Sequence, residues 1–420
     1  MRKIRKRSLV FVAATLLLTG AVSTAYATTR PDPVDPLPLG GFAVATADYT
    51  LGDDAFRVPG FTVGDGDKLA PLELTGRVNY PRDLGAGKHP MVMFEHGDWS
   101  SCADRAAAQR KQAAEKRLYG PDAPQDPAEI ERLEKIIDRA GGLLYRWPCA
   151  PDTPALPNQR GYDYIAKQLA SHGFVVLSIS LSGVNLGALG DGQDAARAAV
   201  ANKHLEMWRD LVTTGKGPLA GRLPGAFRGH VDLQRVGLVG HSRGGRGVMY
   251  QSADVNQSKL PAGVRIGAVL GLEPTRIPPA EAGPEVIAAY TNTRIPSATI
   301  LGTCGYGASD FFTVGKERST APRYLWTVHG ANHNFFNTEW SPQSGQVAAF
   351  DDAGEKEPGK CGPEGKLDRK LTETQQRTVG VAYMSAFFRR YLAGDERFEA
   401  MLSGRTAPLS AVTKVDVQAG

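Results

Sequence analysis

The 420-residue sequence predicts an α/β fold in which a mostly parallel sheet carries helices on both faces. Two observations support this prediction. Short apolar runs without polar alternation recur along the chain, and such runs are typical of strands that are buried on both faces. These runs alternate with longer segments of helical character, as expected for strand–helix–strand units. With 42% hydrophobic and 22% charged residues, the chain can bury a large core.

The N-terminus has the features of a secretory signal peptide over residues 1–27. Five basic residues precede an apolar run at 9–18, and Ala25-Tyr26-Ala27 supplies a small-x-small cleavage site. The apolar run is too short for a membrane anchor, so we expect export without stable membrane insertion. Residues 28–41 are rich in Pro and Asp and predict a flexible arm.

The charge balance excludes some partners. The chain has a formal net charge of +5, but the leader contains five basic residues and no acidic ones, so the mature chain would be near neutral. Nucleic-acid binding is therefore not expected. No Cys-x-x-Cys or His-Glu-x-x-His spacing is present, so neither a metal nor another cofactor is predicted. The sequence does not indicate an oligomeric state.

The elements of one large domain at 42–393 follow in order, and residues 394–420 are expected to form a tail. Strands are predicted from apolar or alternating runs. Helices are predicted from helix-forming composition and apolar stripes. The predicted strands are 43–51, 72–80, 90–95, 174–180, 236–240, 266–272, 296–302 and 324–328. The predicted helices are 103–119, one that begins after Asp126 and ends at Gly141, 160–172, 194–213 and 371–392.

A nucleophile motif lies in the segment 236–249, where an apolar strand breaks at Gly240 and a helix-compatible stretch follows. Gly240-His241-Ser242-Arg243-Gly244 fits the pattern G-x-S-x-G between a strand and a helix. In that setting the serine lies on a strained turn, and the glycines let strand and helix pass closely. The sequence therefore predicts Ser242 as a nucleophile, although a glycine-rich packing turn would show the same five letters.

The oxyanion-stabilising groups are expected at two places. The helix that follows Ser242 directs backbone N–H groups at its N-terminus, and the first is that of Arg243. The strand 90–95 ends in a His-Gly turn, which lies where an acyl-transfer site needs its second donor. We predict the N–H of Asp98 as that donor, with the N–H of Trp99 as the alternative.

A serine nucleophile needs a base, and the base needs an orienting acid. Two histidines follow the last predicted strand, and we expect His333 to be the base because His329 lies too near the strand end. The loop 303–310 offers Asp310 as the acid. The strand 266–272 offers Glu273 at its end as the alternative, and we prefer Asp310.

Four cysteines in an exported chain predict two disulfides, and the sequence leaves three pairings open. The segment 103–148 predicts a helical hairpin that Cys102 and Cys149 would pin at its base. Cys304 and Cys361 are the other two cysteines. Because the hairpin follows the predicted oxyanion loop, it could form a lid or a substrate-binding wall, or a flap that does not contact substrate.

The chain resembles the α/β-hydrolase superfamily, in particular its exported bacterial esterases, lipases and polyester hydrolases. The resemblance covers about 72–392 and is carried by Glu95-His96-Gly97, by 240–245, by the loop after Gly302 and by 330–333. It implies an α/β-hydrolase fold with the helical hairpin inserted after the third strand. The segments 330–336 and 160–164 also resemble a subgroup of secreted hydrolases, in which the loop after Cys304 tends to be richer in Asp.

The motif and the resemblance together predict a secreted serine hydrolase that cleaves a small-molecule or polymeric ester through an acyl-enzyme. Hydrolysis of amides, peptides or other acyl compounds would use the same residues. A non-catalytic binding protein on a hydrolase scaffold is a third interpretation, favoured by the glycines at 305 and 307, where carboxylates are expected.

Overall fold

A nine-stranded sheet lies at the centre of the computed structural model, which describes residues 34–63, 66–186, 191–278, 283–346, 359–363 and 365–420. Its strands are β1 (Val44–Thr50), β2 (Thr75–Pro81), β3 (His89–Glu95), β4 (Val175–Ile179), β5 (Val231–His241), β6 (Ile266–Leu272), β7 (Ser297–Gly302), β8 (Arg323–Val328) and β11 (Val415–Ala419). Their spatial order is β1-β2-β4-β3-β5-β6-β7-β8-β11. The six strands from β4 to β8 in that order are parallel, whereas β1, β2 and β11 pair antiparallel.

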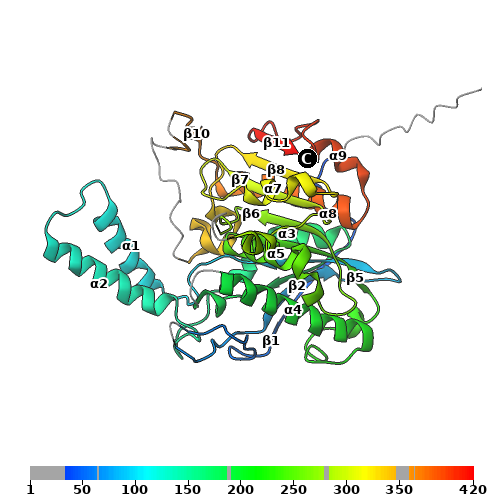
Figure 1. The fold of residues 1–420 in the computed structure, drawn as a ribbon, viewed down its shortest axis with the longest axis horizontal. Helices are drawn as coiled ribbons and strands as arrows, with labels where there is room; N and C mark the ends of the chain where they lie inside the picture. The colour runs from blue at the N-terminus through cyan, green and yellow to red at the C-terminus, as the bar shows by residue number, and fades with distance from the viewer. Residues whose placement is uncertain (1–33, 64–65, 187–190, 279–282, 347–358, 364) are drawn as a thin grey trace, which may run out of the picture. The chain divides into compact units, whose positions relative to one another are not determined.

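Helices cover both faces of the sheet (Figure 1). The helices of the described residues are α1 (Arg105–Tyr119), α2 (Pro127–Leu144), α3 (Asp163–Ser171), α4 (Asp191–Thr214), α5 (Arg243–Ser252), α6 (Pro284–Ala288), α7 (Asp310–Thr313), α8 (Glu373–Leu392) and α9 (Glu399–Leu402). Side chains of α4 and α5 belong to one core cluster, and side chains of α3 and α8 belong to a second. A small two-stranded sheet pairs β9 (Lys360–Cys361) with β10 (Asp368–Arg369).

The two core clusters explain why the strands lack polar alternation. Successive residues of β3 point to opposite faces, so Met91 and Met93 pack in the cluster with α4, whereas Val92 and Phe94 pack in the cluster with α8. All four side chains are buried, which leaves no solvent-facing position on this strand. The α/β fold with a mostly parallel sheet is therefore confirmed.

Two predictions about the ends of the chain are wrong. Residues 394–420 are not a tail, because β11 pairs with β8 and its Val415 and Val417 pack against the core. Residues 34–41, the described part of the predicted flexible arm, lie against α3. Nε2 of Gln168 lies 2.9–3.2 Å from three carbonyl oxygens of 36–38, and Leu37 packs on the core. The predicted signal peptide lies outside the described residues.

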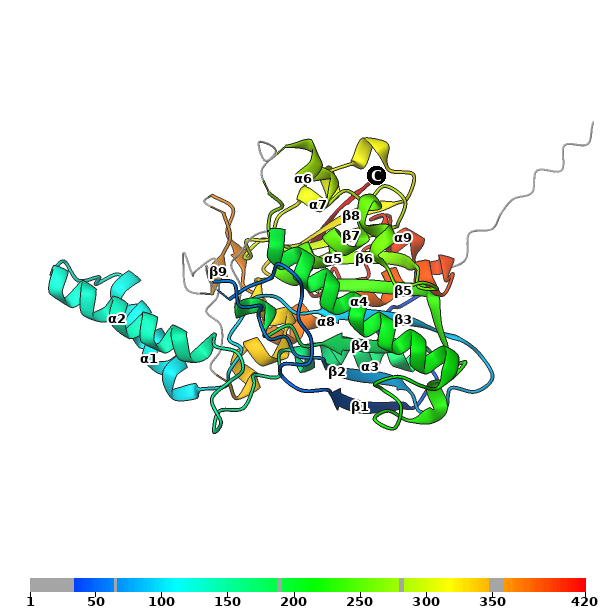
Figure 2. The same ribbon diagram turned by 60° about the horizontal axis from the view of Figure 1, so that its bottom comes forward.

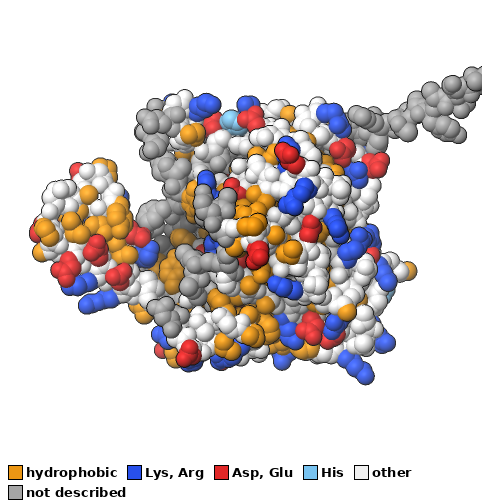
Figure 3. Space-filling view, in the orientation of Figure 1, with side chains coloured by type: hydrophobic (Ala, Val, Ile, Leu, Met, Phe, Trp, Pro, Cys, Tyr) orange, Lys and Arg blue, Asp and Glu red, His pale blue; other side chains and the backbone are white. Residues whose placement is uncertain are grey.

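Helices α1 and α2 form a hairpin that extends away from the sheet (Figures 1 and 2). The side chains of Asp104 and Asp126 accept hydrogen bonds from backbone N–H groups in the first turn of each helix, which stabilises both helix starts. The two helices share small apolar clusters, and apolar side chains are also visible on the hairpin surface (Figure 3). Tyr119, at the end of α1, is a large aromatic residue that is exposed on the hairpin.

Two disulfides resolve the pairing that the sequence left open. Cys102 bonds to Cys149 at the base of the hairpin, and Cys304 bonds to Cys361. Among the described residues, no helix combines the length and the apolar character needed to cross a bilayer.

Candidate active site

Ser242 lies on a sharp turn between β5 and α5. Its backbone has φ 57° and ψ −122°, a conformation that residues other than glycine rarely adopt. Two hydrogen bonds anchor the turn to the end of β6 and the loop that follows it. Ser242 N–H donates to the carbonyl of Leu272, and Thr275 N–H donates to the carbonyl of Ser242. The serine therefore has the strand-turn-helix setting that its motif predicts.

The glycines of the motif are required by close packing. A Cβ atom on Gly240 would lie 2.0 Å from the carbonyl oxygen of Gly244. A Cβ atom on Gly244 would lie 2.4 Å from the carbonyl oxygen of Glu95, at the end of β3. Since real Cβ contacts are never this short, only glycine lets α5 begin directly behind the strand ends.

His333 lies at the same edge of the sheet, in the loop after β8. Nε2 of His241, the residue before Ser242, donates a hydrogen bond of 2.8 Å to the carbonyl oxygen of His333. The two imidazole rings are 5.1 Å apart. Burial lowers the pKa of His241 well below its usual value, so this neighbour stays neutral, and its Nδ1 faces the hydroxyl of Tyr162 at 3.0 Å.

Glu273 is the carboxylate that contacts the His333 imidazole. Its Oε2 lies 3.3 Å from Nδ1 of His333, and both side chains are almost fully buried. Asp310, the acid that we preferred from the sequence, lies in the first turn of α7, where its Oδ2 accepts a hydrogen bond of 3.1 Å from the backbone N–H of Ile277. The geometry therefore favours the alternative acid.

The loop after β7 forms a cradle around the Glu273 carboxylate. The backbone N–H groups of Gly302 and Gly307 donate to its two oxygens. A Cβ atom on Gly305 would lie 2.3 Å from Oε2, and one on Gly307 would lie 2.8 Å from it. The sequence analysis expected carboxylates at these two positions. Glycine is required there because the Glu273 carboxylate, which comes from the end of the neighbouring strand β6, occupies the space that their side chains would fill.

The other predicted histidine has different partners. Nδ1 of His329 lies 3.1 Å from Asp368, and its Nε2 lies 2.7 Å from Asp416. These contacts connect the end of β8 to β10 and β11. The preference for His333 over His329 as the histidine beside the acid therefore agrees with the geometry.

The loop after β3 runs directly against Ser242. A Cβ atom on Gly97 would lie 2.5 Å from Cβ of Ser242 and 3.2 Å from its Oγ. Glycine at this position lets the backbone approach Ser242 closely, as the predicted oxyanion donor on this loop would require.

The peptide between Gly97 and Asp98 has a fixed orientation. The Gly97 carbonyl accepts hydrogen bonds from Nδ1 of His96 at 2.8 Å and from Nδ2 of Asn185 at 3.3 Å. Burial lowers the pKa of His96 to about 3, and its Nε2 accepts from the N–H of Leu181, so the ring is neutral and carries its proton on Nδ1. Because C=O and N–H of a trans peptide point in opposite directions, these bonds also set the direction of the Asp98 N–H.

A group of buried charges lies behind this loop, and it could not be predicted from sequence because its members come from three separate elements. Arg197 of α4 donates to the carbonyl of His96 at 2.9 Å and to Oδ1 of Asn185, so it braces the loop. Asp194 accepts from Nε of Arg246 at 2.6 Å and lies 3.6 Å from Nη2 of Arg243. Desolvation raises the pKa of Asp194, which these arginines oppose.

Glu95 and Asp98 belong to the same group. Neither carboxylate oxygen of Glu95 has a hydrogen-bond partner among the described residues, and burial raises the pKa of Glu95 to about 8. Burial also raises the pKa of Asp98, while Arg197 and Arg243 oppose that shift. A pKa of about 8 favours the neutral form of Glu95 at pH 7, which would leave one negative charge fewer beneath the turn at Ser242.

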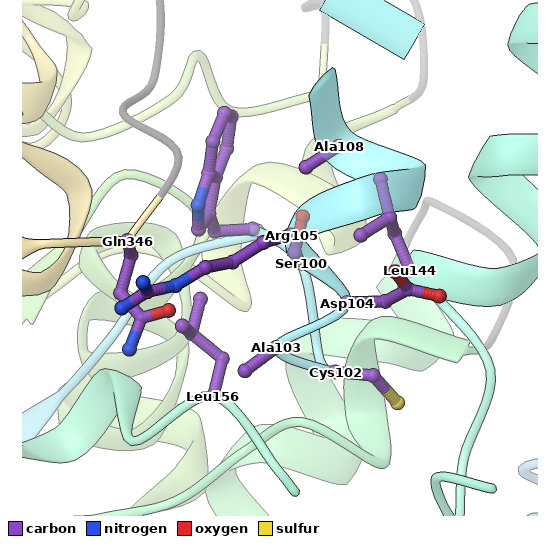
Figure 4. A pocket seen from close by; sticks show the side chains of 10 residues that line it. Ser100, Cys102, Ala103, Asp104, Arg105, Ala108, Leu144, Leu156 and Gln346 are labelled. Atoms are coloured by element: carbon purple, nitrogen blue, oxygen red, sulfur yellow. The ribbon is translucent and has the colours of Figure 1, made fainter. Parts of the chain in front are cut away.

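A small pocket lies at the base of the hairpin, on the side of Trp99 (Figure 4). Leu144 and Leu156 supply apolar lining, and Figure 4 shows the side chain of Arg105 extending towards Gln346. Over the described ranges, no group of three or more His, Cys, Asp or Glu side chains is arranged to hold a metal ion. Comparisons of the sequence with protein-family models and with curated proteins give no match.

Proposed function

We propose that the protein is a secreted serine hydrolase of the α/β-hydrolase type that cleaves carboxylic esters through an acyl-enzyme on Ser242. The observation that carries the proposal is the contact between Glu273 and Nδ1 of His333, at the sheet edge where Ser242 lies on its strained turn. The nucleophile, the acid and the base follow β5, β6 and β8, which are parallel strands of the sheet, and they have the chain order Ser, acid, His.

The first half of the reaction forms the acyl-enzyme. With Nδ1 facing Glu273, the Nε2 of His333 takes the proton of the serine hydroxyl as Oγ attacks the ester carbonyl. The carbonyl electrons move to the oxygen. When the tetrahedral intermediate collapses, the bond to the alcohol breaks and His333 gives its proton to the leaving oxygen. Glu273 orients the ring and stabilises the imidazolium.

Water completes the cycle by the same steps. His333 takes a proton from water, the hydroxide attacks the acyl carbonyl, and Ser242 leaves with the proton that His333 returns. The N–H groups of Arg243 and Asp98 are the assigned donors to the oxyanion in both halves. The loss of one such donor typically costs about 3 kcal/mol of barrier. The fixed Gly97–Asp98 peptide supports Asp98 rather than Trp99 as the second donor.

The hairpin and the disulfides fit this proposal. The loop that follows β3 and approaches Ser242 leads directly into α1, so the hairpin is a candidate wall or lid for the ester. Two disulfides favour an oxidising compartment, as the predicted leader does. The cradle around Glu273 supports catalysis over a non-catalytic scaffold, because Gly305 and Gly307 leave room for a carboxylate that comes from β6.

The test is covalent labelling followed by substrate comparison. A fluorophosphonate probe should modify Ser242 in the oxidised protein, and Ser242→Ala should not react. Matched ester and amide substrates then distinguish ester hydrolysis from amide hydrolysis, and esters graded by acyl length define the substrate. A folded protein that the probe does not label would contradict the proposal.

A further inference from the structure

We propose that Tyr306 is a positioning residue for His333, which it holds in the reactive orientation and stabilises when the imidazole is protonated. This inference rests on the proposed function, because it assigns His333 the role of base. Nothing in the sequence pointed to Tyr306, since its partner lies in a different loop.

The two rings are stacked. Their centroids are 4.1 Å apart and their planes differ by 20°. Tyr306 is 59% exposed, whereas His333 is 1% exposed. A large aromatic side chain that is mostly in water while it stacks on a fully buried imidazole acts as its cover on the solvent side. Tyr306 therefore contributes to the burial of the histidine and receives little burial in return.

The imidazole needs such a restraint. The bond from Nδ1 of His333 to Glu273 is 3.3 Å long, beyond the usual range for N–H···O hydrogen bonds. One long bond is a weak restraint on the side-chain torsions that orient the ring. The stacked Tyr306 ring limits that motion, and the tilted His241 ring, 5.1 Å away, provides a second contact.

The stacked ring also has an electrostatic effect. Within the described part of the chain, the titratable side chains in direct ring or hydrogen-bond contact with His333 are Glu273 from the end of β6, His241 from β5 and Tyr306 itself. His241 remains neutral, so it does not compensate a proton on His333. The π-electrons of Tyr306 attract a cation over the ring face and therefore favour the imidazolium that forms during proton transfer.

The loop that carries Tyr306 is anchored on both sides. Cys304 donates its N–H to the carbonyl of Ala331 at 2.9 Å and bonds covalently to Cys361. Ala308 donates its N–H to the carbonyl of Pro274 at 2.8 Å. The flanking Gly305 and Gly307 have no room for a side chain, so Tyr306 is the residue through which this stretch can cover the histidine.

The experiment compares two substitutions that distinguish the effect of the aromatic ring face from the effect of side-chain volume. Tyr306→Phe retains the aromatic face, and Tyr306→Leu retains an apolar cover without it. Phe42→Leu is the matched control, because Phe42 is a half-exposed aromatic residue that contacts His89 at the start of β3, away from the turn at Ser242. The measurements are kcat and KM across pH, the pH dependence of fluorophosphonate labelling, and the NMR titration midpoint of His333, which requires no turnover.

Tyr306→Phe and Phe42→Leu should behave like the wild type. Tyr306→Leu should lower kcat about threefold to tenfold, with a smaller effect on KM, because the imidazolium loses a favourable contact. Its titration midpoint and the acidic limb of its pH profile should both move to lower pH. An unchanged midpoint in Tyr306→Leu would overturn the inference, as would equal losses in the Phe and Leu variants. Absence of labelling in every variant would instead contradict the proposed function, while the NMR titration would still test the contact.

Discussion

Oε2 of Glu273 accepts a hydrogen bond of 2.9 Å from the backbone N–H of Gly307. The same oxygen lies 3.3 Å from Nδ1 of His333. The cradle therefore fixes the position of the carboxylate that contacts the imidazole. Glu273 itself has φ 46°, a left-handed conformation that lets its side chain turn into the loop after β7.

This relationship predicts which carboxylate supports catalysis. We expect Glu273→Gln to lower kcat by about three to four orders of magnitude, because an amide cannot orient and charge-balance the imidazole as a carboxylate does. Asp310→Asn should leave kcat within about threefold of the wild type, since its amide oxygen can still accept the Ile277 hydrogen bond. Ester hydrolysis by both folded variants measures this. The reverse order of effects would return the role to Asp310.

The cradle predicts a steric effect at two glycines. Gly305→Ala and Gly307→Ala should each displace the Glu273 carboxylate, because the new Cβ would lie 2.3 Å and 2.8 Å from its Oε2. We expect kcat to fall by at least about tenfold, since a displacement near 1 Å at the reacting groups has effects of that size or larger. Gly87→Ala is the control, because its Cβ would meet no atom within 4 Å. Full activity in both alanine variants would show that the carboxylate can be positioned without this cradle.

The sequence predicted the parallel sheet and the nucleophile turn because both depend on local signals. Apolar runs such as 266–272 and 324–328 match strands almost residue for residue. The edge strand β11 was missed because its burial is partial and its short Val-Asp-Val pattern is surrounded by polar residues. Edge strands are bounded by one neighbour only, so their sequences are less constrained.

The acid could not be chosen from sequence because the choice depends on which side chain enters a shared space. Asp310 and Glu273 both follow strands whose carboxyl ends meet at one edge of the sheet, and the residues around them in the sequence do not distinguish the two. The decisive fact is the packing of Glu273 against Gly305 and Gly307, which are more than thirty residues away in the chain. The contact of Tyr306 with His333 and the bracing of the oxyanion loop by Arg197 have the same origin.

The bracing of the oxyanion loop gives a third prediction. Nδ2 of Asn185 donates to the carbonyls of Gly97 and Trp99, each at 3.3 Å. Asn185→Ala removes both bonds but keeps the bond from Nδ1 of His96, so the Gly97–Asp98 peptide loses part of its restraint and its N–H can tilt away from the oxyanion. We expect kcat to fall about tenfold with little change in KM, less than the hundredfold or greater loss for removal of a donor. Steady-state kinetics on one ester measures this.

Asn202→Ala is the matched control for that measurement. Asn202 lies in α4, the helix that follows the short turn with Asn185. Its side chain bonds to Lys259 and Gln251 and not to the loop after β3. It should retain wild-type kcat. If Asn185→Ala changed KM alone, the loop would contribute to substrate binding and not to oxyanion stabilisation.

The buried Glu95 predicts a pH dependence of stability. Burial raises its pKa from 4.5 to about 8, so the folded protein holds a proton that the unfolded chain releases at lower pH. The stabilising contribution of this proton is therefore complete below the unfolded pKa and is lost as the pH rises through about 8. Glu95→Gln cannot ionise, so its Tm should fall less between pH 6 and 9 than that of the wild type. Glu131→Gln, at an exposed glutamate of α2, should follow the wild-type curve. Parallel Tm curves for the wild type and Glu95→Gln would show that Glu95 does not retain its proton in the folded protein. Glu95 would then be a third buried negative charge near Ser242, besides Asp194 and Asp98.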